Sequence, residues 1–145
     1  KCFGEAVSAD VPSGPDALTY FGALAQTETG DMHRFGNAIA YSERVPLGVC
    51  AGIGAWNYPV QIACWKAAPA LASGDVFILR PSEMTPISGN RIAKLFAEAG
   101  LPTGLFQVIH GDYHIGRAIC EHPGIAKISL TGGVETGKLI MAQSA

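Results

Sequence analysis

The sequence lacks long apolar runs and blocks of like charge. Its longest uninterrupted apolar stretches, such as residues 76–79, fall far short of the roughly 20 residues that a membrane-spanning helix needs. Lysine and arginine total 10 against 12 aspartate and glutamate, and no five-residue basic or acidic run occurs. These absences argue against a transmembrane segment and against nucleic acid or an anionic membrane as partner.

Two further absences concern the N-terminus and the cysteines. Residues 1–5 lack Met and the charged-then-apolar layout of a signal peptide, so we expect a segment of a longer protein that is not secreted. The cysteines Cys2, Cys50, Cys64 and Cys120 show neither disulfide-scaffold nor zinc-site spacing. We therefore expect reduced thiols in a cytoplasmic protein, all four being small core residues rather than nucleophiles.

What is present is enough apolar sequence for one core, arranged as alternating extended and helical segments. With 145 residues and 48% hydrophobic residues, we expect one domain or most of one. The series predicts an α/β fold with a doubly wound parallel, Rossmann-like sheet. Glycines 74, 100, 104, 111 and 124 fall between elements, where we expect positive φ angles. The expected helices are 16–26 (start signal at 13–15, stop at Gly30), 59–71, 86–99, 115–121 and 134–142, and the extended segments are 38–45, 47–53 after a bend at Pro46, 76–79, 106–109 and 126–130.

Ligands of such sheets bind beyond the carboxyl ends of the strands, where three segments stand out: 52–59, 80–86 and 131–137. The first lacks the third glycine of a dinucleotide fingerprint, so a simple tight turn remains an alternative. The third joins glycines to a helix N-terminus and suits a phosphate, although an ordinary turn explains it too. In the second, Arg80 and Glu83 could hydrogen-bond a ribose diol or form a surface ion pair.

Four other polar side chains are candidates. Asn57 could donate to a developing oxyanion or simply cap the helix that follows. Lys66, on an apolar helix, either reaches solvent or serves a buried carboxylate. His110 and His114 have a metal-like spacing, but Gly111 and Asp112 interrupt a shared helix and no third ligand is evident, so we expect no metal ion there.

From about Asp16 to the C-terminus, the motifs of this chain and the order in which they occur resemble those of the aldehyde dehydrogenase superfamily. The similar segments are 46–49 (PLGV), 54–59 (GAWNYP), 65–74 (WKAAPALASG), 81–86 (PSEMTP) and 131–133 (TGG). Within the superfamily, GIGAWNYP, QIA at 61–63 and TGGVETGK at 131–138 are most similar to betaine aldehyde dehydrogenases. Trimethylaminobutyraldehyde dehydrogenases are close behind.

The resemblance implies NAD(P)-dependent oxidation of a small aldehyde, betaine aldehyde to glycine betaine, to a carboxylic acid. A cysteine thiolate adds to the aldehyde, hydride leaves to the nicotinamide, and a glutamate-activated water hydrolyses the thioester. Asn57 matches the oxyanion-hole amide and Lys66 matches a charge-relay lysine. The matching cofactor-binding residues are Gly54, Ala55 and Trp56, then Arg80, Pro81, Ser82 and Glu83, then Gly133, Val134, Glu135 and Thr136.

The resemblance also sets expectations for cofactor preference and assembly. Glu83 near the adenine ribose fits NAD, since a carboxylate repels a 2′-phosphate, while Arg80 in place of the usual Lys leaves NADP open. Potassium bound by backbone carbonyls near Met84 would suit the betaine-aldehyde branch. The family implies a homodimer or homotetramer, with residues 37–46 reaching into the oligomerisation region.

The chain holds no match to the family's catalytic Glu or Cys motifs. Residues 1–145 are therefore interpreted as a partial NAD(P)-binding domain without the catalytic domain. The alternative is a short non-catalytic protein that binds nucleotide or a partner, with a crystallin-like structural role as a third reading.

Overall fold

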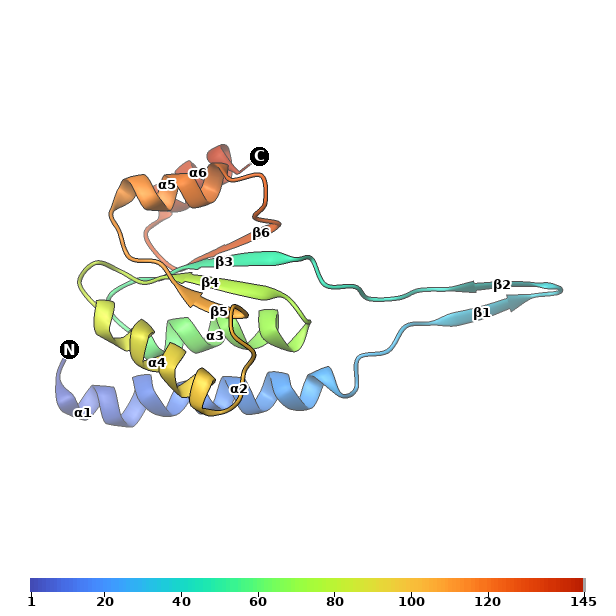
Figure 1. The fold of residues 1–145 in the computed structure, drawn as a ribbon, viewed down its shortest axis with the longest axis horizontal. Coiled ribbons are helices and arrows are strands. Elements are labelled where there is room, and N and C mark those ends of the chain that lie inside the picture. Colours follow the sequence, from blue (N-terminus) through green and yellow to red (C-terminus); the bar gives the residue numbers. More distant parts are fainter. Residues whose placement is uncertain (145) are drawn as a thin grey trace.

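In a computed structural model, which describes residues 1–144, the chain forms a parallel four-stranded sheet between helices and a separate two-stranded hairpin (Figure 1). This confirms the predicted α/β class. The helices are α1 Phe3–Glu5, the π-helix η1 Ala6–Asp10, α2 Val11–Ala25, α3 Pro59–Ala72, α4 Pro86–Glu98, α5 Tyr113–Glu121 and α6 Val134–Gln143. The strands are β1 Met32–Phe35, β2 Ala38–Tyr41, β3 Val49–Ile53, β4 Val76–Arg80, β5 Phe106–Val108 and β6 Lys127–Leu130.

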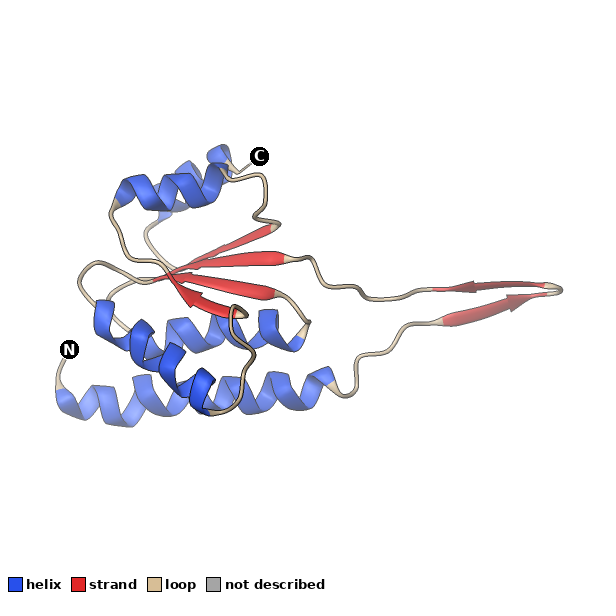
Figure 2. Cartoon of the chain, viewed as in Figure 1, coloured by secondary structure: helices blue, strands red, loops and turns tan. Residues whose placement is uncertain are grey.

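The sheet has the strand order β5-β4-β3-β6, and every pairing in it is parallel. Helices α3 and α4 cover one face and α5 and α6 the other, so the sheet is doubly wound (Figures 1 and 2). The chain moves outward from β3 to β5 and then returns to place β6 on the other side of β3. The order therefore reverses between β3 and β6, and the carboxyl ends of these two strands flank the crevice where such folds bind ligands.

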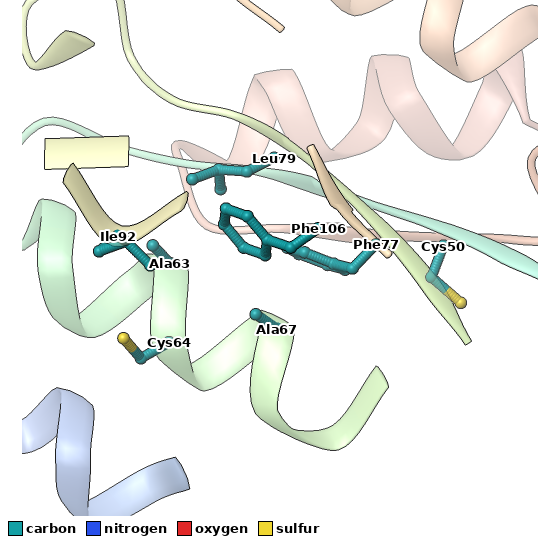
Figure 3. Close-up of a cluster of buried hydrophobic side chains, with 8 residues drawn as sticks. All are labelled: Cys50, Ala63, Cys64, Ala67, Phe77, Leu79, Ile92 and Phe106. Carbon is teal, nitrogen blue, oxygen red and sulfur yellow. The ribbon is translucent and has the colours of Figure 1, made fainter. Parts of the chain in front are cut away.

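The main core lies between the sheet and α3 and α4. Phe77 and Leu79 of β4 are both 1% exposed, and the Phe77 ring lies 5.9 Å from that of Phe106 (Figure 3). Small side chains on α3, Ala63 and Ala67, let this helix approach the two rings. Burying each aromatic side chain stabilises the fold by roughly 1.5–3 kcal/mol.

The N-terminal helix is longer than predicted. We expected it to start at Asp16 after a signal at Ser13-Gly14-Pro15, but helical structure runs through α1, η1 and α2 from Phe3 to Ala25. Proline removes an N–H from the helical ladder, yet the helix continues here: Pro12 lies in the first turn of α2, after the π-helical segment that ends at Asp10, and Pro15 lies inside α2. Gly14 faces α3, where a Cβ would come 3.1 Å from Cys64 Sγ.

The hairpin was only half predicted. We expected one extended segment over 38–45, whereas β2 ends at Tyr41 and pairs antiparallel with β1, which was missed. Gly36, with φ of 60°, and Asn37 form the two-residue turn, a dipeptide that favours such hairpins. Every residue of β1 and β2 is exposed, and the hairpin extends away from the rest of the fold (Figure 1).

Most other element boundaries lie within two residues of the expected ones. Among the inter-element glycines, Gly124 does not have the positive φ expected of it, whereas the other four do. The prediction that all cysteines are core residues is wrong for Cys2, which is exposed, and correct for the three buried thiols. Burial raises the pKa of Cys64 to about 11, and all four thiols are unbonded.

Candidate functional site

The carboxyl ends of β3, β4 and β6 hold the three candidate segments together at one edge of the sheet. The Gly54 N–H donates to the carbonyl of Arg80 at 2.9 Å, and the Thr131 N–H donates to that of Ile53 at 3.0 Å. Because these bonds continue the parallel ladder past the strands, segments 52–59, 80–86 and 131–137 emerge side by side.

A pocket of about 390 Å³ lies between α3 and the end of β6. It brings together the two residues that the sequence assigned to catalysis, Asn57 and Lys66, although they belong to a turn and a helix. Both are therefore available to one ligand at the switch point between β3 and β6. The lining residues are Asn57, Tyr58, Gln61, Ile62, Trp65, Lys66, Ser129 and Thr131.

Asn57 belongs to the turn before α3. The N-cap position of this helix is occupied by Tyr58, and no side chain of the cap residue bonds the helix, so Asn57 is not the N-cap. Its backbone carbonyl accepts a bond of 2.7 Å from Lys1 Nζ. Within residues 1–144 its side-chain amide has no hydrogen-bond partner, and it can donate to an oxygen bound in the pocket.

Lys66 has a different partner from either one expected. Its Nζ donates to Ser129 Oγ at 2.8 Å, so its partner is a hydroxyl rather than a buried carboxylate, and the partly buried side chain lines the pocket. Burial lowers the pKa of Lys66 to about 8, because the charged form loses hydration. A side chain with this pKa can exchange a proton near neutral pH.

Two aromatic side chains in this pocket, Tyr58 and Trp65, were missed as site residues by the sequence reasoning. The Trp65 indole N–H donates to Ser13 Oγ at 2.9 Å. The ammonium of Lys1 lies 3.2 Å from the centre of the Tyr58 ring, so the face of that ring accepts a cation. Tyr58 precedes the first residue of α3 and Trp65 lies within the helix, so no local pattern marked the two as neighbours, and the pocket that both line shows it.

A second pocket, of about 140 Å³, lies between α5 and α6 beside the end of β3. It brings together Arg80 and Thr136 from two of the predicted cofactor segments. The sequence did not predict the α5 residues of this pocket, because they carry no motif and are brought to it only by the packing of α5 against α6. Its lining residues are Ile53, Arg80, Tyr113, Gly116, Arg117, Cys120, Thr136, Leu139, Ile140 and Gln143.

Arg80 and Glu83 form an ion pair, as one of the two alternatives expected. The Arg80 side chain is only 12% exposed, and its Nη2 also donates to the Gly111 carbonyl at 2.7 Å. Glu83 is 58% exposed and leaves one carboxylate oxygen toward solvent. Pro81 and Ser82 form the turn between them, in which the Ser82 hydroxyl accepts the Met84 N–H at 3.3 Å.

The N-terminus of α6 is open. Gly133 occupies the N-cap without a side-chain cap, and a Cβ at this glycine would meet no atom within 4 Å. Val134 is 75% exposed, and Glu135 pairs with Lys138 at 3.0 Å. The first amides of α6 can therefore receive an anionic group, while the side chains of residues 134 and 135 face outward.

The remaining predicted residues contribute less to these pockets. Trp56 is 61% exposed and, with Gly54 and Ala55, lines neither of the two. His110 bonds Asn90 Oδ1 at 2.9 Å. In the part of the chain that the structure describes, no group of three His, Cys, Asp or Glu side chains could hold a metal ion, and no helix is long and apolar enough to cross a membrane.

Comparison with curated proteins gives two betaine aldehyde dehydrogenases among the relatives. Betaine aldehyde dehydrogenase 2 of Rhizobium meliloti (strain 1021) is 54% identical over 94% of this chain, which covers 28% of that protein. Betaine aldehyde dehydrogenase of Vibrio vulnificus (strain YJ016) is 51% identical over 100% of the chain and 30% of that protein. The chain thus spans less than a third of these relatives.

Solved structures show the same fold. The NAD+ complex of an aldehyde dehydrogenase from Bacillus cereus superposes with a TM-score of 0.94 at 34% identity, over 99% of this chain and 30% of that one. PnpE in complex with nicotinamide adenine dinucleotide gives a TM-score of 0.91 at 37% identity, over 97% and 29%. The aldehyde dehydrogenase family model matches residues 1–145, beyond the expected start of the likeness at Asp16. The chain belongs to the aldehyde dehydrogenase family.

Proposed function

We propose that this chain is part of the NAD-binding domain of an enzyme that oxidises betaine aldehyde to glycine betaine, and that it supplies the donor for the aldehyde oxygen. The observation that carries the proposal is the pocket at the switch point, where Asn57, Lys66 and two aromatic rings meet. The betaine aldehyde dehydrogenases among its relatives support the choice of substrate.

The residues present fit a dinucleotide. An open helix N-terminus at Gly133 suits the pyrophosphate, and the pocket between α5 and α6 is lined by Thr136 of the first turn of that helix and by Arg80. Glu83 keeps a carboxylate oxygen free for ribose hydroxyls and opposes a 2′-phosphate, so we propose NAD rather than NADP. When bound, the nicotinamide accepts the hydride.

Asn57 is proposed to stabilise the oxyanion that forms when a nucleophile adds to the aldehyde. Its amide has no competing partner within residues 1–144, and α3 fixes the turn that carries it. Lys66 and Ser129 lie across the same pocket, where an amine with a pKa of about 8 can take up or release a proton. Removing one oxyanion donor typically costs 10²–10³ in kcat.

Tyr58 and Trp65 are proposed to bind the trimethylammonium group. A quaternary ammonium cannot donate hydrogen bonds, so aromatic faces are its usual protein ligands. The position of the Lys1 ammonium over the Tyr58 ring supports this assignment, since it is a cation–π contact within the protein. Among the described residues that line the pocket there is no carboxylate, and the two rings supply the attraction for the cation; Lys66 opposes it only in its protonated form.

The first test uses the complete polypeptide that contains this chain, with NADH formation from betaine aldehyde as the assay. Asn57→Ala is expected to lower kcat by about 10²–10³. The matched control is Asn90→Ala, since Asn90 is an asparagine on α4 whose side chain bonds His110 and lines neither pocket. If the parent protein binds NAD but oxidises no aldehyde, the non-catalytic nucleotide-binding module replaces this proposal.

The second test separates charge recognition from shape. The uncharged analogue 3,3-dimethylbutanal replaces the trimethylammonium group by a tert-butyl group of similar size. Trp65→Leu is expected to lower the preference for betaine aldehyde over this analogue by about 2- to 30-fold, the range of one cation–π contact. An unchanged preference would remove the substrate assignment, and faster turnover of trimethylaminobutyraldehyde would favour that branch.

We further propose that the β1–β2 hairpin joins subunits of a homodimer or homotetramer. Its exposed apolar side chains include Met32, Phe35, Ile39 and Tyr41, with exposed fractions of 56–73%. Such a surface is costly in an isolated subunit. Ile39→Asp in the complete protein is expected to lower the sedimentation coefficient toward that of a smaller species.

Binding of potassium near Met84 stays a prediction. It is tested by comparing the rate of aldehyde oxidation in potassium buffer with that in sodium buffer.

A further inference from the structure

Three charged side chains of the first ten residues contact the turn that carries Asn57. Lys1 bonds the Asn57 carbonyl at 2.7 Å and lies over the Tyr58 ring, and Glu5 accepts the Tyr58 hydroxyl at 2.5 Å. Asp10 accepts the first available amides of α3. These contacts join residues 50 or more positions apart in sequence.

Asp10 occupies the place that a helix N-cap side chain normally takes. Its Oδ1 accepts the Gln61 N–H at 2.8 Å and the Val60 N–H at 3.1 Å, and the residue is 3% exposed. The local sequence cannot supply this cap, because Tyr58 has no acceptor within reach of these amides and Pro59 has no N–H. The carboxylate therefore caps α3 from another helix.

The same carboxylate is connected to Asn57 through Lys1. Lys1 Nζ lies 3.7 Å from Asp10 Oδ2 and donates to the Asn57 carbonyl. The Lys1–Asp10 ion pair, whose side chains are 15% and 4% exposed, thus holds the Asn57 carbonyl through Lys1 and the amides of Val60 and Gln61 through Asp10. The charge of Asp10 is compensated by Lys1 and by the positive end of the α3 dipole.

We propose that Asp10 is a positioning residue for Asn57, acting through the first turn of α3. This inference rests on the proposed function, since it assigns Asp10 a part in orienting the oxyanion donor. Displacing a catalytic group by about 1 Å can cost as much as 10²-fold in rate. Loss of the cap frees the turn without removing Asn57, so we expect a smaller effect than that of removing the amide.

The test measures kcat for betaine aldehyde in the complete polypeptide. Asp10→Ala is expected to lower kcat about tenfold and to leave the KM for NAD unchanged. Asp10→Asn keeps an acceptor oxygen and is expected to retain most of the parent's kcat. In an Asn57→Ala background, Asp10→Ala is expected to cause no further loss of kcat. This non-additivity separates positioning from a general loss of stability.

The matched control is Asp75→Ala. Asp75 is 4% exposed and its Oδ1 accepts the Gly48 N–H at 2.8 Å, at the opposite edge of the sheet. Amide hydrogen exchange supplies a readout that needs no activity: Asp10→Ala is expected to accelerate exchange in a peptide covering residues 57–61, and Asp75→Ala is not.

The outcomes are distinguishable. A kcat for Asp10→Ala within twofold of the parent, or an equal loss with and without Asn57, overturns the positioning role while leaving the proposed function intact. A parent protein that oxidises no aldehyde overturns both. If Asp10→Ala does not fold, Asp10→Glu, with an acceptor displaced by one methylene, takes its place and must show the same loss and the same non-additivity.

Discussion

A single methyl group at Gly52 tests the packing between β3, β4 and α3. An ideal Cβ at this position would lie 2.5 Å from Phe77 Cζ and 3.1 Å from Lys66 Cδ, well inside van der Waals contact. Phe77 is 1% exposed and packed against Phe106, so its ring has little room to withdraw. Gly52→Ala must therefore displace core atoms.

The size of the effect follows from two opposing contributions. Overpacking a well-filled core costs roughly 1–3 kcal/mol. Replacing a strand glycine by alanine returns about 0.5–1 kcal/mol of backbone entropy. We therefore expect Gly52→Ala to lower the free energy of unfolding by about 0.5–2 kcal/mol. Urea denaturation of the complete protein measures this as a lower midpoint at unchanged m.

Two companion variants make the result interpretable. Gly22→Ala on α2, where a Cβ meets no atom within 4 Å, is expected to stabilise by up to about 1 kcal/mol. Phe77→Leu shortens the obstructing side chain, so the cost of Gly52→Ala is expected to shrink in that background. A Gly52→Ala protein as stable as its parent, or a cost unchanged by Phe77→Leu, would refute this account of the core.

Three further predictions concern titration, reactivity and cofactor binding. Between pH 8 and about 10.4 the unfolded chain keeps the proton of Lys66 while the folded chain releases it, so the free energy of unfolding rises with pH in this range. In urea unfolding, Lys66→Met is therefore expected to stabilise the protein more at pH 7 than at pH 10. Equal effects at the two pH values would contradict the lowered pKa. Cys64, with a pKa of about 11, is expected to resist iodoacetamide at pH 8 in the folded protein while exposed Cys2 reacts, as peptide mass spectrometry will show. Arg80→Met breaks the Glu83 ion pair and the bond to Gly111, and is expected to raise the KM for NAD about 3- to 10-fold with kcat for the aldehyde little changed; an unchanged KM would remove Arg80 from the cofactor site.

Much of the fold could be predicted because its signals are local. The apolar run 76–79 and the amphipathic segments around it mark β4 and its neighbouring helices. The glycine and proline residues between them mark the turns, so boundaries came within two residues. The N-terminal helix was misjudged because proline inside a helix normally ends or kinks it, whereas α2 continues through Pro15.

The site was predictable in part. The order of the motifs identified Asn57 and Lys66 as site residues. The pattern of parallel strands predicted that the segments after the strands lie at one edge of the sheet. The partner of Lys66 was wrong, because Ser129 lies on a different strand 63 positions away. Tyr58 and Trp65 were missed as site residues, since an aromatic on an apolar helix is usually a core residue.

By itself, the sequence determined the class of the fold, the order of the elements from β3 onward and the family, since periodicity and motif spacing are properties of neighbouring residues. Only the tertiary structure decided which side chains meet: the Asp10 carboxylate on the amides of α3, Arg80 on the Gly111 carbonyl, and the hairpin standing apart from the sheet. The physical reason is that hydrogen bonds and packing act over a few ångströms in space, whatever the separation along the chain.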